Sequence, residues 1–228
     1  MKMNNTEQMY LDFHAHILPG VDHGSSSLET SLQQLEAARE AEIGTIVATS
    51  HFYPHLHQVE EFLSLRDRRF QLLEPHLADY GITVLKGAEV QLCIGLDKMQ
   101  NLEKLCIEGT DLLLLEIPDM PMTAEMFETI ERIHKRMRVL IAHVNRYPKK
   151  TVQKLLDRKY MLQLNAEAFT PLLLEQNIRQ ILESGLVYAL GSDVHGSGKR
   201  AYRSLKKAIR RLGVQNDVIQ QRMKGLLQ

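Results

Sequence analysis

The stretch Asp12-Phe13-His14-Ala15-His16 ends the first apolar run of the chain and carries two histidines two positions apart. Side chains at positions i and i+2 of an extended strand point to the same side, so both imidazoles can reach one metal ion. One such pair is a weak signal, because two histidines also occur by chance at strand ends and on loops. The residues at the later strand ends therefore have to show whether this pair belongs to a metal site.

Five further apolar runs end in residue types that bind metals. They stop at His51, at Glu89, at Glu116, at His143, and at Asp193 with His195. Lysine, serine, asparagine or glutamine would serve equally well at strand ends that merely face solvent, so a chance scatter of polar residues explains the pattern poorly. We therefore expect strand ends that are distant in the sequence to meet in one site that holds several metal ions.

The same runs predict the fold class. Strand-like runs lie near residues 9–14, 45–50, 83–89, 112–117, 138–144, 161–165 and 188–192. Helical patterns lie between and after them, near 28–42, 59–80, 123–135, 149–159, 174–184, 201–212 and 218–227, with an uncertain helix at 97–106. This alternation predicts parallel strands, and ligand types at so many strand ends favour a closed barrel over an open sheet. We predict an α/β fold, a distorted seven-stranded (β/α)7 TIM-like barrel.

Length and charge limit the classes of partner. A chain of 228 residues is long enough for one large core, so we expect a disordered lead-in over residues 1–9 and a single domain over 10–228. Lys plus Arg and Asp plus Glu both total 28, and the formal net charge of zero gives no global field that would attract nucleic acid or a membrane surface. We predict no nucleic-acid partner, and the sequence leaves the oligomeric state open.

The cellular location is predicted from the cysteines and from the apolar stretches. Cys93 and Cys106 form no CxxC pair, which suits a reducing compartment, and neither is followed by an arginine at the spacing of a thiolate phosphatase loop. No apolar stretch reaches the roughly 20 residues that cross a bilayer, and the first ten residues lack the apolar core of a signal peptide. We therefore expect a cytoplasmic protein without membrane insertion.

An ordered set of motifs gives a resemblance to a known superfamily. The motifs are D-F-H-A-H at 12–16, T-S-H at 49–51, G-A-E at 87–89, L-L-E at 114–116, A-H-V-N-R-Y at 142–147 and G-S-D-V-H at 191–195. From about Tyr10 to the C-terminus, the chain resembles the polymerase and histidinol phosphatase (PHP) superfamily, and within it the bacterial capsule-associated protein-tyrosine phosphatases. The resemblance implies a metal-dependent phosphomonoesterase that acts on phosphotyrosine, its partner being the tail of a tyrosine kinase linked to capsule or exopolysaccharide synthesis.

The resemblance also implies a ligand set for three divalent metal ions, either manganese or iron or zinc. The first ion would be held by His14, His16, Glu89 and Asp193; the second by Glu89, Glu116 and His143; the third by His51, His195 and a residue of the loop after the first strand. A hydroxide that bridges two ions would attack phosphorus. Arg146 and Arg200 would hold the non-bridging phosphoryl oxygens.

The sequence departs from the family pattern at two positions. The loop after the first strand reads Val21-Asp22-His23-Gly24 where these phosphatases usually have V-D-D-G, so we assign His23 as the ligand of the third ion. The alternatives are that Asp22 turns inward instead, or that the third metal ion is bound weakly. Asn145 replaces a usual glutamate, while the arginine after it is retained.

Other roles and functions stay open at this point. His55 or His57 could donate a proton to the leaving group, or both could be ordinary loop histidines. The basic segment 199–211 could be a solvated helix face or a docking stripe for an acidic tail. The alternative functions are a small-molecule phosphatase such as histidinol phosphatase, a phosphodiesterase or exonuclease of the same superfamily, and a non-catalytic binding module.

Overall fold

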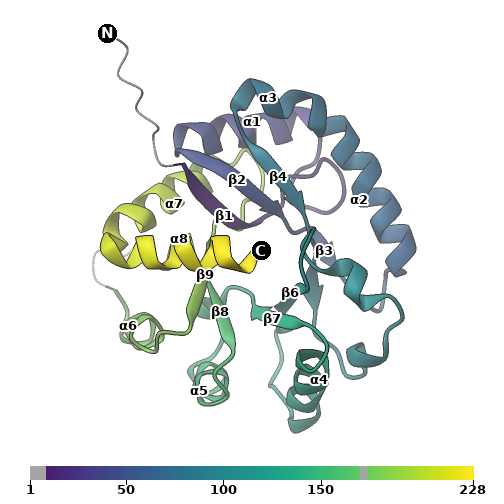
Figure 1. The fold of residues 1–228 in the computed structure, drawn as a ribbon, viewed down its shortest axis with the longest axis vertical. Coiled ribbons are helices and arrows are strands. Elements are labelled where there is room, and N and C mark those ends of the chain that lie inside the picture. Colours follow the sequence, from purple (N-terminus) through teal and green to yellow (C-terminus); the bar gives the residue numbers. More distant parts are fainter. Residues whose placement is uncertain (1–8, 170–173) are drawn as a thin grey trace.

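Parallel strands run through the centre of the molecule and helices cover them from outside (Figure 1). The computed structural model describes residues 9–169 and 174–228. Its strands are β1 (Tyr10–Ala15), β2 (Ile43–Ala48), β3 (His51–Phe52), β4 (Thr83–Lys86), β5 (Glu89–Gln91), β6 (Leu112–Glu116), β7 (Arg138–Ile141), β8 (Met161–Asn165) and β9 (Val187–Gly191). Its α-helices are α1 (Leu28–Glu40), α2 (Val59–Leu73), α3 (Leu77–Tyr80), α4 (Ala124–His134), α5 (Lys149–Asp157), α6 (Gln176–Glu183), α7 (Lys199–Leu212) and α8 (Val214–Leu226).

The strands form two sheets. One has the order β1-β2-β4 and the other the order β3-β5-β6-β7-β8-β9, and every pair is parallel. Two of the predicted runs are each broken in the middle, one into β2 and β3 and the other into β4 and β5. The predicted α/β fold with parallel strands is confirmed. The described strands do not close into one hydrogen-bonded barrel, which is where the structure differs from the prediction.

A side chain interrupts the ladder at the first break. The Thr49 hydroxyl accepts a hydrogen bond from the Ala15 backbone N–H at 3.1 Å, in place of a carbonyl oxygen of a continuing strand. Backbone bonds on both sides of the second break, from Gly87 N to Ala48 O at 2.8 Å and from Glu89 N to Ser50 O at 3.0 Å, keep the two halves of each run together. The break therefore redirects the strand ends without separating them.

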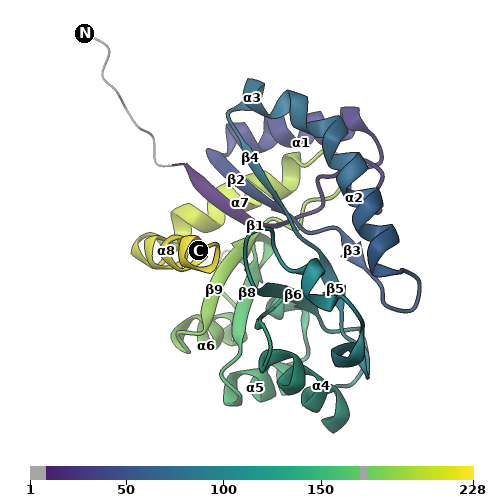
Figure 2. The ribbon, with the colours of Figure 1, turned by 45° about the vertical axis from the view of Figure 1, so that its right-hand side comes forward.

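The two sheets also meet where β1 lies beside β9 (Figures 1 and 2). The backbone joins them through a bond from Asp193 N to His14 O at 2.8 Å, and the buried Asp12 carboxylate accepts from Ser192 N at 2.8 Å and from Ser192 Oγ at 2.5 Å. Gly191 permits this approach, because a Cβ there would lie 2.5 Å from the Cβ of His14. The Asp12 side chain thus accepts hydrogen bonds where paired strands would use backbone carbonyl groups.

The helices follow the predictions with two corrections. The predicted helix 59–80 is divided into α2, a 3₁₀ turn at Glu74–His76 and α3, because Pro75 has no N–H to donate. The uncertain helix 97–106 consists of 3₁₀ turns at Leu96–Lys98 and Leu102–Leu105. Helix α1 begins at the N-cap residue Ser27, whose side chain accepts a hydrogen bond from Thr30 N at 3.1 Å.

A single hydrophobic cluster fills the space between the strands and the helices, from Leu11 on β1 to Leu226 on α8. In Figure 2, α8 lies beside β1 and β9, and its Gln220 side chain accepts a hydrogen bond from Leu11 N at 3.0 Å. Within the described ranges, no helix is long and apolar enough to cross a membrane. Apart from Met9, the predicted lead-in over residues 1–9 lies outside the described residues and stays a prediction.

We expect Asp12→Ala to lower the free energy of unfolding by about 2–4 kcal/mol, because it leaves the buried Ser192 N–H and hydroxyl without their acceptor. Asp12→Asn keeps one acceptor oxygen and should cost about half as much. Urea denaturation of metal-free protein measures both values. Asp79→Ala, at an exposed position of α3, is the control and should change stability by less than about 0.5 kcal/mol. Equal stability of Asp12→Ala and the parent chain would contradict the role of this contact.

Candidate metal centre

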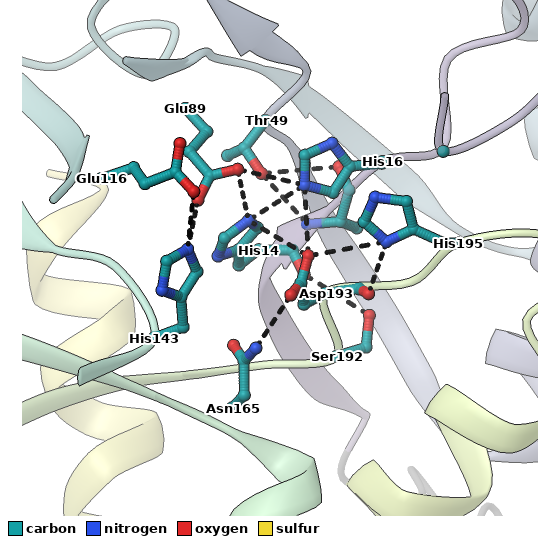
Figure 3. A network of polar contacts seen from close by, with 12 residues as sticks. His14, His16, Thr49, Glu89, Glu116, His143, Asn165, Ser192, Asp193 and His195 are labelled. Atoms are coloured by element: carbon teal, nitrogen blue, oxygen red, sulfur yellow. Dashed lines mark hydrogen bonds and ion pairs between the residues drawn. The ribbon is translucent and has the colours of Figure 1, made fainter. Parts of the chain in front are cut away.

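The carboxyl ends of the strands meet in one buried cluster of imidazoles and carboxylates (Figure 3). His14 and His16 come from the end of β1, and Glu116 from the last position of β6. The others lie at or just after the remaining strands: His51, Glu89, His143, Asp193 and His195. Because parallel strands end at the same edge, residues up to 181 positions apart in the sequence (14 and 195) come together here.

Glu89 occupies the centre of the cluster. Its side chain is 1% exposed, and its Oε2 lies 3.3 Å from Nε2 of His14, 3.3 Å from Nε2 of His16 and 3.0 Å from Nδ1 of His51. Its other oxygen lies 2.8 Å from Nε2 of His143. A carboxylate with imidazoles on both oxygens is in the position of a group that can bridge two cations.

Asp193 closes the cluster on the opposite side from Glu116. Its Oδ1 lies 3.2 Å from Nε2 of His16, and its Oδ2 lies 2.6 Å from a guanidinium nitrogen of Arg146. The backbone of Asp193 has φ 50° and that of His143 has φ 32°, both in the left-handed region that non-glycine residues rarely adopt. Such conformations persist where the surroundings over-determine them, and here both aim a side chain into the cluster.

The donor atoms fit metal ions. Several buried side-chain atoms of the cluster make no hydrogen bond among the described residues: His51 Nδ1, Glu89 Oε2, Glu116 Oε2, His143 Nδ1 and His195 Nε2. Leaving such atoms unsatisfied is costly, whereas a coordinated cation would satisfy them. Three groups have ligand atoms all within 4.8 Å of one another, namely His16-His51-His195, His14-His16-Glu89 and His51-Glu89-Glu116. Mixed imidazole and carboxylate donors suit manganese, iron or zinc.

Two amide side chains on β8 support the cluster from below, and the sequence analysis did not find them. Gln163 Oε1 lies 3.2 Å from Nδ1 of His14 and accepts from His143 N at 2.6 Å. Gln163 Nε2 donates to Asn165 Oδ1 at 2.9 Å, and Asn165 Nδ2 donates to Asp193 Oδ2 at 2.9 Å. Since the two residues are two positions apart on a strand, the signal was present as a pair of amides on one face of the run M-L-Q-L-N.

Asp22 points into the cluster and contacts His16 and His51. Its Oδ2 lies 2.8 Å from Nδ1 of His16 and accepts from His51 N at 2.9 Å, and its Oδ1 accepts from Gly24 N at 2.9 Å. A carboxylate on one nitrogen of an imidazole fixes the ring so that the other nitrogen faces the metal. Asp22 therefore orients His16 in this structure.

His23 lies at the edge of the cluster. Its side chain is exposed, and its ring is 4.9 Å from that of His51 and 4.7 Å from that of His195, measured between centroids. It belongs to none of the three groups of close ligand atoms found in the described residues. Its assignment as the ligand of a third ion stays a prediction.

The two predicted arginines border the same cavity, which has a volume of about 340 Å³ and which we call the arginine cavity. It is lined by Arg146, Glu167, Ser192, Asp193, His195, Arg200, Ala201 and Ser204. Arg200 is exposed near the start of α7, and Arg146 also bonds Glu167 at 2.8 Å. Asn145, the second departure from the family pattern, faces β8 and accepts from Asn165 N at 2.9 Å.

A family model for capsular polysaccharide synthesis proteins, CpsB/CapC, matches residues 10–224. The chain belongs to the CpsB/CapC family. This confirms the resemblance to the capsule-associated proteins. Tyrosine-protein phosphatase CpsB of Streptococcus agalactiae is 22% identical to it over 200 residues, which cover 81% of this chain and 82% of the relative.

Solved structures share the fold of this CpsB/CapC chain. One comes from the crystal structures of YwqE from Bacillus subtilis and CpsB from Streptococcus pneumoniae, described as unique metal-dependent tyrosine phosphatases. It matches with a TM-score of 0.75 at 20% identity and covers 95% of this chain and 94% of that one. Histidinol phosphate phosphatase of Lactococcus lactis, in complex with zinc, L-histidinol and phosphate, matches with a TM-score of 0.60 at 13% identity, covering 90% and 94%.

Opposite charges within the cluster change the pKa values of its members. Burial lowers the pKa of His143, but hydrogen bonds to Glu116 and Glu89 outweigh burial and raise it to about 9. Burial likewise disfavours the charged form of His16, yet its contacts with Asp193, Asp22 and Glu89 raise its pKa well above the usual value. Burial would raise the pKa of Glu89, but the neighbouring His14 and His143 hold it well below its ordinary range. Protons on the imidazoles and cations therefore compete for the same carboxylates.

We expect metal binding near pH 7 to release about one or more protons for each protein molecule, because an imidazole with a pKa of about 9 is protonated there and must lose that proton to coordinate. The apparent affinity should rise as the pH increases towards 9 and then level off. Calorimetric titration with Mn²⁺ in buffers of different ionisation enthalpy measures the proton count. Binding without proton release at pH 7 would contradict this prediction.

We expect Asp22→Asn to weaken metal binding by about 10–100-fold, because the amide cannot hold the His16 ring as the carboxylate does. His23→Ala tests the competing assignment. A loss of one ion from the stoichiometry of His23→Ala, measured by elemental analysis, would support ligation by His23. If His23→Ala keeps its metal stoichiometry while Asp22→Asn binds metal more weakly, His23 is not a ligand and Asp22 acts by orienting His16.

Proposed function

We propose that this chain is a metal-dependent phosphomonoesterase that hydrolyses phosphotyrosine in a protein, and that its substrate is the tail of a tyrosine kinase linked to capsule or exopolysaccharide synthesis. The observation that carries the proposal is the arginine cavity, where two guanidiniums lie beside Asp193 and His195 of the candidate metal centre. Membership of the CpsB/CapC family and the printed activity of its tyrosine phosphatase relatives support the choice of substrate.

The metal ligands in this proposal are those that the strand ends bring together. Three divalent ions, manganese or else iron or zinc, would be held by His14, His16, Glu89, Asp193, Glu116, His143, His51 and His195, with His23 as the further ligand of the third ion. Bound there, such ions would lower the pKa of coordinated water and neutralise phosphoryl charge. Gln163 and Asn165 would keep His14 and Asp193 in place, as their hydrogen bonds do in this structure.

Arg146 and Arg200 would bind the phosphoryl group. A guanidinium has five N–H donors in a planar fork, and Arg146 uses its Nε for Glu167 and one terminal nitrogen for Asp193, so further donors remain for phosphoryl oxygens. Arg200, which also lines the arginine cavity, would supply a second fork. Both guanidiniums would then stabilise the negative charge on the non-bridging oxygens.

The cysteines are poor nucleophiles. Burial, followed by the charges of Asp111 and Glu103, raises the pKa of Cys106 to about 12, and burial also raises the pKa of the half-buried Cys93. A thiolate is the reactive form of cysteine, so neither residue is activated near neutral pH. Water is therefore the nucleophile in this proposal.

The proton for the leaving group is assigned to solvent or to His55. Burial lowers the pKa of His57, and its Nδ1 accepts a hydrogen bond from Tyr53 N at 3.0 Å, so this ring is neutral and engaged in its own loop. His55 is exposed in the same loop. A tyrosine leaving group has a free pKa of about 10 and departs more readily than an alkoxide, which makes strong acid assistance unnecessary.

We also propose that residues 10–228 act as one catalytic domain with a seven-stranded barrel arrangement, and that the reaction takes place in the cytoplasm. The single hydrophobic cluster supports the first point. Two free cysteines support the second, because unpaired thiols suit a reducing compartment.

The test is turnover by metal-loaded protein on a phosphotyrosine peptide, a phosphoserine peptide, histidinol phosphate and a bis-aryl phosphodiester. We expect the highest kcat/KM on the phosphotyrosine peptide. Preference for histidinol phosphate would select the small-molecule phosphatase, and predominant cleavage of the diester would overturn the phosphomonoesterase proposal. No turnover of any substrate by fully metal-loaded protein would favour a binding module.

Arg146→Ala and Arg200→Ala should each lower kcat/KM on the phosphotyrosine peptide by about 10²-fold, because each removes a donor of charge-assisted hydrogen bonds to the phosphoryl group. Arg203→Ala, on the same helix as Arg200 but outside the arginine cavity, is the control and should leave kcat/KM unchanged. Metal stoichiometry is measured in parallel. Normal activity of either cavity variant would remove that arginine from the mechanism.

A further inference from the structure

A second and larger cavity opens from the candidate metal centre. Its volume is about 650 Å³, and it is shared with the cluster through Glu116 and His143 and with the arginine cavity through Arg146. We call it the β6–α5 cavity, because the loop after β6 and the start of α5 line it. A group attached to a phosphate bound at Arg146 would therefore enter this space. Its size is that of an ordinary small-ligand pocket.

One wall of the β6–α5 cavity is apolar. The loop after β6 contributes Ile117, Pro118, Met120, Pro121 and Met122, and Tyr147 and Pro148 face them. Met120 is 59% exposed, so a large apolar side chain stands at the cavity mouth without cover. The backbone is held in place on both sides, since the Tyr147 hydroxyl accepts from Ile117 N at 2.9 Å. Methionine and proline walls of this kind fit the face of an aromatic ring.

The other wall is cationic. Lys150 and Lys154 line the cavity and lie four positions apart, on one face of α5. The Lys154 ammonium is 5.7 Å from the centre of the Phe127 ring. Lys150 is exposed and makes no ion pair or hydrogen bond with any residue that the structure describes. Asp119, itself exposed, is an acidic residue that also lines this cavity, from the loop after β6.

We propose that the β6–α5 cavity binds the tyrosyl ring of a phosphotyrosine peptide against its apolar wall and an acidic residue next to that tyrosine against Lys150. This inference rests on the proposed phosphotyrosine phosphatase activity and adds a substrate preference to it. The cavity would favour an aromatic leaving group with negative charge beside it, because Lys150 adds a charge attraction that an uncharged neighbour lacks. The cavity, and not the basic face of α7, is then the element that reads the sequence around the phosphotyrosine.

Lys150→Glu is the central test, with Lys149→Glu as its matched control. Lys149 is the adjacent exposed lysine of α5 and does not line the cavity. Kinetics are compared on two phosphotyrosine peptides that differ in having acidic or neutral flanking residues. We expect Lys150→Glu to raise KM for the acidic peptide about five- to tenfold more than for the neutral peptide, since the change replaces an attraction by a repulsion. Lys149→Glu should leave this ratio as it is in the parent chain.

Lys207→Glu distinguishes the cavity from α7, where Lys207 is exposed on the basic face. A larger effect of Lys207→Glu than of Lys150→Glu on the acidic peptide would overturn the proposal in favour of a docking stripe on α7. Equal effects of Lys150→Glu on both peptides would also overturn it. If the parent chain hydrolyses neither peptide, the proposed function itself has failed, and that result is separate from a parent chain that is active but indifferent to flanking charge.

The apolar wall is tested with Met120→Ser, for which Val214→Ser, 80% exposed at the start of α8, is the control. Loss of the apolar side chain should raise KM for p-nitrophenyl phosphate about two- to fivefold more than KM for a short alkyl phosphate. The control should change neither value. Equal changes on the aryl and alkyl esters would show that the ring does not contact this wall.

Discussion

The structure depends on a buried carboxylate, Glu89, whose two oxygens face four imidazoles from three different strand ends. Charged groups removed from water are tolerated only when they are paired, so the strands must end within a few ångströms of one another. The contacts that hold His16 and Asp193 in this arrangement come from Asp22 and Asn165 respectively. A cation would satisfy the atoms of the cluster that lack hydrogen bonds, which links the stability of this region to metal binding.

The meeting of β1 and β9 shows how the fold keeps these groups together. Here the chain relies on Asp12 and Ser192, 180 positions apart, together with the absence of a side chain at Gly191. His14 lies two positions after Asp12 and Asp193 directly follows Ser192, so a contact at the level of Asp12 sets the spacing of two candidate ligands. Stability and site geometry are thus connected through one pair of strands.

The two cavities beside the metal cluster are proposed to bind different parts of the substrate. Arg146 belongs to both cavities, with the metal cluster on one side and the β6–α5 cavity on the other. The residues proposed for phosphate binding and those proposed for leaving-group recognition are therefore adjacent, with Arg146 lining both cavities. Variation at Met120 or Lys150 could alter substrate preference without touching the residues proposed to hold metal, because neither side chain is part of the cluster.

Much of the fold and of the site could be predicted because the apolar runs of the strands end, one after another, in metal-ligand residue types. The α/β alternation, the parallel strands and the gathering of residues such as His14, Glu89 and Asp193 follow from apolar runs that each stop at a ligand type. The division of the helix at Pro75 also has a local cause in the sequence, because proline has no N–H to donate. Amide supports such as Gln163 were missed because this residue lies in the middle of β8 and an amide is not among the metal-ligand types that mark the strand ends.

By itself, then, the sequence determined which residue types stand at the strand ends and that the strands run parallel, since both follow from local periodicity. Only the tertiary structure decided that Asp22 faces His16 while His23 stays exposed, that two runs break and the sheets meet through Asp12, and that a cavity opens beside Glu116. The physical reason is that these features depend on contacts between distant segments, where packing and hydrogen bonding select among conformations that local sequence permits equally.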